Sequence, residues 1–188
     1  ILAAHPGIGT VVRSKPGAPR LVQGVTSVAE LLQFVEATRM QAMAQREIVA
    51  DDGMAALLGC SPGQHWFEVT VLRTLAGLAE PLAQVLVYLR PEHADVIAHI
   101  DASTQPIFTM IESRHGTRVA EVSQEITPVA LTRPSAQLLQ AAPGCPALQI
   151  VRRYFDAQDR IILVSVGLYP GDRFSHSTRF RVQREARV

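Results

Sequence analysis

Several features that would point to particular protein classes are scarce or missing in this sequence. It has only two cysteines, Cys60 and Cys145, which lie far apart and outside any metal-ligand spacing. It also shows no signal peptide and no apolar run long enough to cross a membrane. These absences exclude a disulfide scaffold and give no reason to predict a metal site. We expect a reduced, cytoplasmic protein without a membrane partner.

Neither sign of charge is in excess. The 188 residues include 18 Lys and Arg against 17 Asp and Glu, a net charge of +1, so composition alone does not require nucleic acid or a membrane surface as a partner. Arginine greatly outnumbers lysine, which suits binding of planar anions but is also typical of a GC-rich genome. A hydrophobic content of 47% and a mean hydropathy of +0.14 indicate a folded globular protein.

The stretch from Cys145 to Phe180 is the most clearly patterned part of the chain. It predicts two long strands joined by a polar turn at Asp156 to Arg160, and the second strand ends in a compact corner from Tyr169 to Phe174. Elsewhere strands outnumber helices, connections are short, and strand and helix do not alternate regularly. We therefore predict an α+β fold with a single antiparallel sheet flanked by helices.

Side chains alternate between the two faces of a strand, so the second strand of this hairpin presents two different rows. One row is aliphatic, and the other, which includes small residues, consists of Leu163, Ser165, Gly167 and Tyr169. The small residues leave room for a ligand; alternatively, Gly167 marks close packing or a bulge and Ser165 is a core hydroxyl with a partner. Tyr88, in the expected strand Leu82 to Arg90, is likewise either a pocket wall or a core residue.

Two arginines fall on otherwise apolar strand faces. Arg73 follows Val69 and Val71 on one face of the strand His65 to Leu75, and Arg152 shares a face of the hairpin with Ile150 and Tyr154. A guanidinium does not lose its charge cheaply, so each side chain either reaches the rim of the core or meets an anion. For Arg73 an ion pair with Glu80 or another carboxylate is an equally good interpretation. Arg153, on the opposite face from Arg152, is expected in solvent.

Helix signals occur at four places. Ser27 and Glu30 form a capping box for a helix with Val28, Leu31, Leu32 and Val35 on one face. Asp51 and Asp52 begin a helix that Gly59 ends, after a short strand at Arg46 to Ala50. A third helix is expected from Ser103 to Arg114, and Thr132 caps a fourth with Pro134 in its first turn.

The start of the third helix is a candidate anion site. Ser103 and Thr104 add two hydroxyl groups to the free N–H groups expected there, although most such residues only cap their own helix. Signs of catalysis are weaker. Gly59 to Gly63 matches G-x-S-x-G, but a helix precedes it and a strand follows, the reverse of what a nucleophile elbow needs. We interpret it as a helix stop and turn, and we predict no catalytic residue and no cofactor.

An ordered set of short motifs resembles the UTRA domain, the effector-binding module of HutC-type regulators in the GntR family. The set comprises Ala55 to Gly59 with Gly63, then Val69, Val71 and Arg73, Glu80-Pro81, Tyr88-Leu89, Ser103 to Phe108, Glu121, Glu125-Ile126, Ala136 to Leu139, Pro146 to Tyr154, Asp156, and Tyr169 to Phe174. The resemblance spans roughly Val28 to Arg184. It implies a chorismate-lyase-like fold, in agreement with the predicted single antiparallel sheet.

The beginning of the chain adds to this resemblance. Pro6 to Val12 is similar to the last hairpin, or wing, of the winged helix-turn-helix of GntR proteins. The resemblance therefore implies a wing remnant at 1–13, a linker at 14–27 and a UTRA effector-binding and dimerisation domain at 28–188. The recognition helix would lie upstream of Ile1. Operator DNA would then be bound through an N-terminal domain that this chain lacks, and the protein would be a homodimer.

The resemblance also implies a function, a ligand-sensing domain that controls DNA binding. It would bind a small anionic metabolite. The residues implied for this site are Arg73, Tyr88, Ser103, Thr104, Arg152, Ser165 and Tyr169. Two positions depart from the sugar-phosphate-binding members, which often carry a second arginine where Leu75 stands and a carboxylate near Leu163. We therefore expect an effector with one acidic end and an apolar or aromatic body. A chorismate-lyase-like enzyme acting on an aromatic acid and a purely structural dimerisation domain are the alternatives.

Overall fold

Six strands form one antiparallel sheet at the centre of the structure. The computed structural model describes residues 2–5, 9–12, 21–23 and 38–178, and its main sheet has the order β4-β5-β6-β9-β8-β7. The strands are β4 (Thr38–Val49), β5 (His65–Leu75), β6 (Ala83–Leu89), β7 (Glu121–Ala130), β8 (Pro146–Phe155) and β9 (Ile161–Pro170). All neighbouring pairs are antiparallel. The predicted α+β fold with one antiparallel sheet is confirmed.

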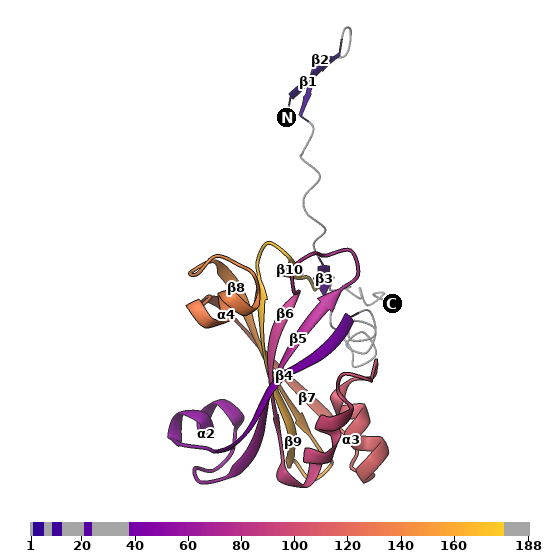
Figure 1. Cartoon of the computed structure of the whole chain (residues 1–188), viewed down its shortest axis with the longest axis vertical. Helices are drawn as coiled ribbons and strands as arrows, with labels where there is room; N and C mark the ends of the chain where they lie inside the picture. The colour runs from indigo at the N-terminus through magenta and orange to yellow at the C-terminus, as the bar shows by residue number, and fades with distance from the viewer. Residues whose placement is uncertain (1, 6–8, 13–20, 24–37, 179–188) are drawn as a thin grey trace, which may run out of the picture.

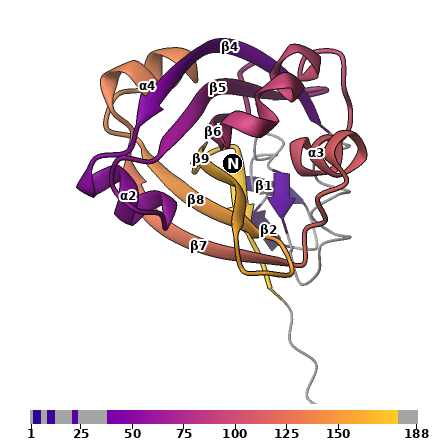
Figure 2. The same cartoon turned by 90° about the horizontal axis from the view of Figure 1, so that it is seen from below.

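Helices cover both faces of this sheet. The 3₁₀ helix η1 (Pro91–His99) and α3 (Ile107–His115) lie on one face, and α2 (Asp52–Leu58) and α4 (Arg133–Leu138) lie on the other (Figures 1 and 2). The main core fills the first face, where Ile100 and Ile111 join Val69 in one apolar cluster. Smaller clusters lie around Trp66 under α2 and around Leu139 under α4. The sheet is thus buried on two sides.

The hairpin of β8 and β9 has the turn that its sequence predicts. The Asp156 carboxylate accepts hydrogen bonds from the backbone N–H groups of Gln158 and Arg160, both at 2.9 Å, and from Nε of Arg160 at 2.8 Å. The backbone hydrogen bond from Arg160 is the main reason why the pKa of Asp156 is lowered. This polar turn fixes the register in which β8 pairs with β9.

Two helices also have the ends that we expected. The Asp51 carboxylate accepts from the backbone N–H of Met54 at 2.8 Å at the start of α2, and Gly59 ends that helix in the left-handed conformation with a φ of 73°. The segment Gly59 to Gly63 is therefore a helix stop and turn. Thr132 caps α4 by accepting from the backbone N–H of Ser135.

Strand β4 is longer than its sequence predicts, because it starts at Thr38 rather than Arg46. It is an edge strand that pairs along its length with β5, with a register shift between Ala42 and Ala44. Most of its side chains are exposed, so backbone pairing rather than apolar alternation defines the strand. The helix expected from Ser27 lies outside the described residues.

The interpretation of Arg153 as a solvated side chain is wrong. Its Nε and Nη2 donate to the carbonyl oxygen of Leu57 at 3.1 and 2.7 Å, and only 19% of the side chain is exposed. The carbonyl groups at the end of a helix lack partners within the helix, and a guanidinium suits this position in both hydrogen bonding and charge. Arg153 therefore joins β8 to the end of α2.

The described residues near the N-terminus form short strands. Strand β1 (Leu2–His5) pairs antiparallel with β2 (Gly9–Val12), and β3 (Leu21–Gln23) pairs in parallel with β10 (Phe174–His176), which follows the corner after β9. The antiparallel pair is compatible with the predicted wing, and β3 falls inside the predicted linker. The domain boundaries at 13 and 27 stay predictions.

Candidate functional site

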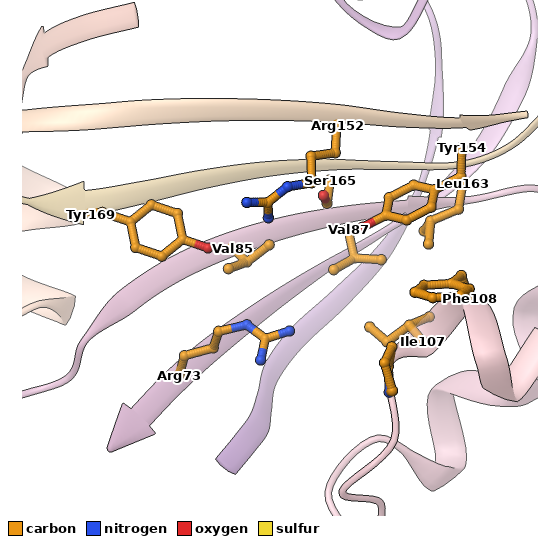
Figure 3. Close-up of a pocket in the computed structure, with 11 residues that line it drawn as sticks. Arg73, Val85, Val87, Ile107, Phe108, Arg152, Tyr154, Leu163, Ser165 and Tyr169 are labelled. Atoms are coloured by element: carbon orange, nitrogen blue, oxygen red, sulfur yellow. The ribbon is translucent and has the colours of Figure 1, made fainter. Parts of the chain in front are cut away.

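One cavity lies on the face of the sheet that η1 and α3 cover (Figure 3). It measures about 40 Å³, within about 450 Å³ of space between atoms that includes its opening to solvent. Its lining combines four strands and the start of α3 and consists of Arg73, Val85, Val87, Pro106, Ile107, Phe108, Arg152, Tyr154, Leu163, Ser165 and Tyr169. None of these lining residues is acidic.

Arg73 brings a positive charge to the cavity from β5. Its Nη1 donates to the Thr38 hydroxyl at 2.7 Å, and its Nη2 lies 3.4 Å from the sulfur of Met40. Burial lowers the pKa of the Arg73 guanidinium, and the positive charge of Arg152 acts in the same direction. The structure therefore holds this cation in surroundings that disfavour its charge, and an anion in the cavity would reverse that effect.

Arg152 provides the second charge, from β8. Arg152 is only 6% exposed, and its Nε donates to the side-chain oxygen of Gln124 at 2.7 Å. Strands β6 and β9 lie between β5 and β8 in the sheet, and the guanidinium groups of Arg73 and Arg152 flank the same space from either side (Figure 3). Two cations converging on one small cavity make it suited to an anion.

Hydroxyl groups lie beside the two arginines. Ser165 is the register partner of Arg152 and lines the cavity together with Tyr154, whose pKa is raised by burial. Tyr169 reaches the cavity from the end of β9 and turns its hydroxyl toward it (Figure 3). These groups can orient a polar ligand by hydrogen bonding.

Gly167 has a packing role, as one of the two interpretations of its row predicts. A Cβ atom at Gly167 would stand 2.5 Å from Cε2 of Tyr169, far closer than two carbon atoms can approach. The Tyr169 ring therefore occupies the space that a side chain at position 167 would need.

The structure places the other predicted site residues elsewhere. Tyr88 is 2% exposed on the opposite face of the sheet, in the cluster with Trp66, and its register partner on β5 is Glu68. Burial is the main cause of its raised pKa. Val85 and Val87, which alternate with Tyr88 on β6, line the cavity instead. Tyr88 is thus a core residue, the second interpretation offered by its sequence.

Ser103 and Thr104 do not reach this cavity either. Helix α3 starts at Ile107 after the cap residue Pro106, so the prediction that it begins at Ser103 is wrong. A proline disfavours helical geometry in the residue before it, and the Ser103 hydroxyl instead accepts from the backbone N–H of Gln105 at 3.0 Å. Both residues line a separate cavity with Arg39, Met40 and Asp101.

Sequence reasoning expected an anion site at the start of this helix but did not identify the residues of α3 that line the cavity. Pro106, Ile107 and Phe108 line the cavity at the first turn of that helix, where the helix dipole and free N–H groups favour an anion. The pattern placed Ile107 in a buried stripe but could not place that stripe beside the arginines. Within the described parts of the chain, no cluster of His, Cys, Asp or Glu could hold a metal ion, and no helix could span a bilayer.

A pair of histidines joins α3 to η1 and predicts a pH dependence of stability. His93 is 7% exposed, its ring centroid lies 4.7 Å from that of His115, and its Nδ1 is buried without a hydrogen-bond partner. Asp95 faces the pair and accepts from Arg114 and His115 at 2.8 and 2.7 Å. Burial and the neighbouring His115 lower the pKa of His93.

We expect the melting temperature to fall as the pH is lowered below about 6.5. Because the folded-state pKa of His93 is depressed, the unfolded state takes up a proton first. The contribution of neutral His93 to the free energy of unfolding is therefore complete above the pKa of His93 in the unfolded state. It is lost as the pH falls through the lower pKa of His93 in the folded state. His93→Gln should flatten this part of a pH series of thermal melts. Asp95, whose pKa is also lowered, affects stability only at more acidic pH. If the melting temperature of His93→Gln depended on pH as steeply as that of the wild type, His93 would not be the group responsible.

The fold and the cavity together define a class, the α+β domains with one antiparallel sheet that enclose a cationic cavity on one face. A model of the UTRA domain matches residues 36–175, well over half of the chain. The chain therefore belongs to the UTRA domain family. The HTH-type transcriptional repressor NagR of Bacillus subtilis is 26% identical over 172 residues, covering 90% of this chain and 68% of that protein.

Solved structures share the same fold. The effector domain of PhnF from Mycobacterium smegmatis superposes with a TM-score of 0.70 at 19% identity, over 86% of this chain and 100% of that one. The ligand-binding domain of a GntR-family transcriptional regulator from Bordetella bronchiseptica superposes with a TM-score of 0.66 at 22% identity, over 77% of this chain and 89% of that one. With the family match, this identifies a UTRA effector domain of a GntR-family transcriptional regulator.

Proposed function

We propose that this domain binds a small anionic metabolite in the cavity between Arg73 and Arg152 and that the ligand controls DNA binding by an attached winged-helix domain. The observation that carries the proposal is the convergence of two guanidinium groups from non-adjacent strands on one cavity. A carboxylate or phosphate placed between them would accept charge-assisted hydrogen bonds from both. The first turn of α3 supports the same ligand charge.

The rest of the cavity favours an apolar body for this ligand. Val85, Val87 and Ile107 form aliphatic walls, and the rings of Phe108 and Tyr154 stack with centroids 5.4 Å apart. Leu163 is 3% exposed and lines the cavity, where it offers no partner to a sugar hydroxyl. Leu75 packs against the same core without lining the cavity. We therefore propose an acid with an apolar or aromatic body.

A thermal-shift screen tests the ligand class. Saturating aromatic acids such as phenylacetate and phenyl phosphate are expected to raise the melting temperature by about 5 °C or more, because a ligand that binds only the folded state stabilises it. Sugar phosphates should have a much smaller effect, since the apolar walls leave their hydroxyl groups without partners. A screen in which sugar phosphates alone stabilise the protein would contradict the proposed ligand class.

The ligand would act by favouring one arrangement of the DNA-binding heads over another. We propose a cytoplasmic homodimer of the HutC type that binds operator DNA through an N-terminal winged-helix domain, with residues 14–27 as the linker. A purely structural dimerisation domain would bind no such ligand. Arg73→Ala in the full-length regulator separates the two readings, because only a sensor should lose ligand-induced operator release. The related NagR is a transcriptional repressor, which agrees with a regulatory rather than an enzymatic role.

A further inference from the structure

We propose that Gly167 and Phe174 are positioning residues that couple the cavity to β3 through the Tyr169 ring. The inference rests on the proposed ligand-binding function and adds the route by which occupancy of the cavity reaches the N-terminal segment. Three features of the structure carry it: the size of the cavity, the packing of Tyr169, and the pairing of β10 with β3.

The cavity is too small for the ligand class that its lining favours. A volume of about 40 Å³ accommodates only a few water molecules, whereas an aromatic acid is several times larger. A ligand that enters the cavity with its aromatic body would therefore displace lining side chains. Val85, Val87 and Tyr169 all belong to the main core cluster. Tyr169 differs in that it stands near the end of its strand and turns a polar group, its hydroxyl, into the cavity (Figure 3).

Tyr169 is packed tightly between two neighbours. On one side its ring lies over the backbone of Gly167, where a Cβ would meet Cε2 at 2.5 Å and the hydroxyl oxygen at 3.2 Å. On the other side its centroid is 4.4 Å from that of Phe174, at an interplanar angle of 34°. Phe174 is fully buried. Because the ring cannot move toward Gly167, a ligand that displaces it must change its contact with Phe174.

Phe174 is the first residue of β10, and its backbone is the register partner of Leu21 in β3. The pairing continues through Ser175 with Val22 and His176 with Gln23 and extends no further in the described residues. So short a pair opens at low free energy, and it is sensitive to the position of its first residue. A displacement of the Tyr169 ring therefore acts on β3, which falls inside the predicted linker.

Hydrogen–deuterium exchange of the amides in β3 and β10 tests this coupling without any ligand. Gly167→Ala forces the Tyr169 ring out of its position, so exchange in both strands is expected to accelerate about threefold or more. Gly53→Ala is the matched control, because its Cβ would meet only the Asp51 carboxylate at an ordinary 3.5 Å, and it should leave exchange in β3 unchanged. Unchanged exchange in a folded Gly167→Ala protein would overturn the proposal.

Phenyl phosphate provides the second arm of the test. At saturation, judged by thermal shift, it should accelerate exchange of β3 and β10 in the wild-type protein and in the Gly53→Ala control. Phe174→Leu should still bind phenyl phosphate but lose the exchange response, because Leu does not reach the displaced ring. Binding without any response in the wild type would overturn the coupling and leave the ligand site standing. Failure of aromatic acids to bind at all would overturn the ligand site and the coupling with it.

Discussion

Replacing Arg152 with Met is expected to weaken the binding of an aromatic acid about 100-fold or more. The ligand would lose one of two guanidinium partners in a cavity largely closed to water, where removing one member of a hydrogen-bonded charge pair costs about 2–5 kcal/mol. The fold should survive, because Met retains much of the aliphatic volume and the substitution removes a like charge that lowers the pKa of Arg73. Titration calorimetry on wild type and variant measures the effect.

The neighbouring Arg153 offers a matched control for this experiment. Arg153→Met makes the same chemical change one residue along β8, on the opposite face of the sheet. It removes both hydrogen bonds to the Leu57 carbonyl, so it should lower the melting temperature and leave the affinity within about twofold. Arg73→Met should behave like Arg152→Met. Equal affinities for Arg152→Met and Arg153→Met would show that the acid does not bind between the two arginines.

Replacing Arg173 with Met is expected to lower the free energy of unfolding by about 3 kcal/mol or more. Arg173 is 7% exposed, and it donates from Nη1 to the carbonyl oxygens of Pro81, at 2.7 Å, and Leu139, and from Nη2 to that of Gln140 at 3.0 Å. It thereby ties the corner after β9 to the entry of β6 and the end of α4. Each buried carbonyl left without a donor costs about 1–3 kcal/mol.

Arg160 is a suitable comparison for the stability experiment. Its side chain is 74% exposed and pairs with Asp156 at 2.8 Å in the hairpin turn, so Arg160→Met should cost less than about 1 kcal/mol. Urea unfolding of both variants, with the m-value checked for two-state behaviour, gives the two free energies. A loss in Arg173→Met no larger than in Arg160→Met would contradict the bridging role of Arg173.

The strands of the main sheet other than β4 were predictable from sequence because their alternation is clear. The rows that place Arg73 with Val69 and Val71, and Arg152 with Tyr154, follow from a period of two along each strand, and the structure confirms both faces. Asp156 and Gly59 marked a turn and a helix end by local chemistry alone. Such signals need no knowledge of tertiary structure.

The parts that could not be predicted depend on tertiary contacts. The alternation of β6 gave two faces, and only packing decides that Val87 rather than Tyr88 faces the arginines. Arg153 looks like a surface residue until α2 is placed above it. The start of α3 differed because Pro106 acts as the cap rather than as a residue within the first turn. The sequence also could not show that α3 lies over the cavity.

The binding of an acid between Arg73 and Arg152 is tested most directly by an NMR titration of the arginine Nε–H resonances with phenyl phosphate. Variants Arg73→Met and Arg152→Met assign the two signals. We predict that both resonances shift along one saturable curve and that each variant abolishes the shift of the remaining arginine. Resonances that stay unmoved while phenyl phosphate stabilises the protein would place the ligand elsewhere and contradict the account.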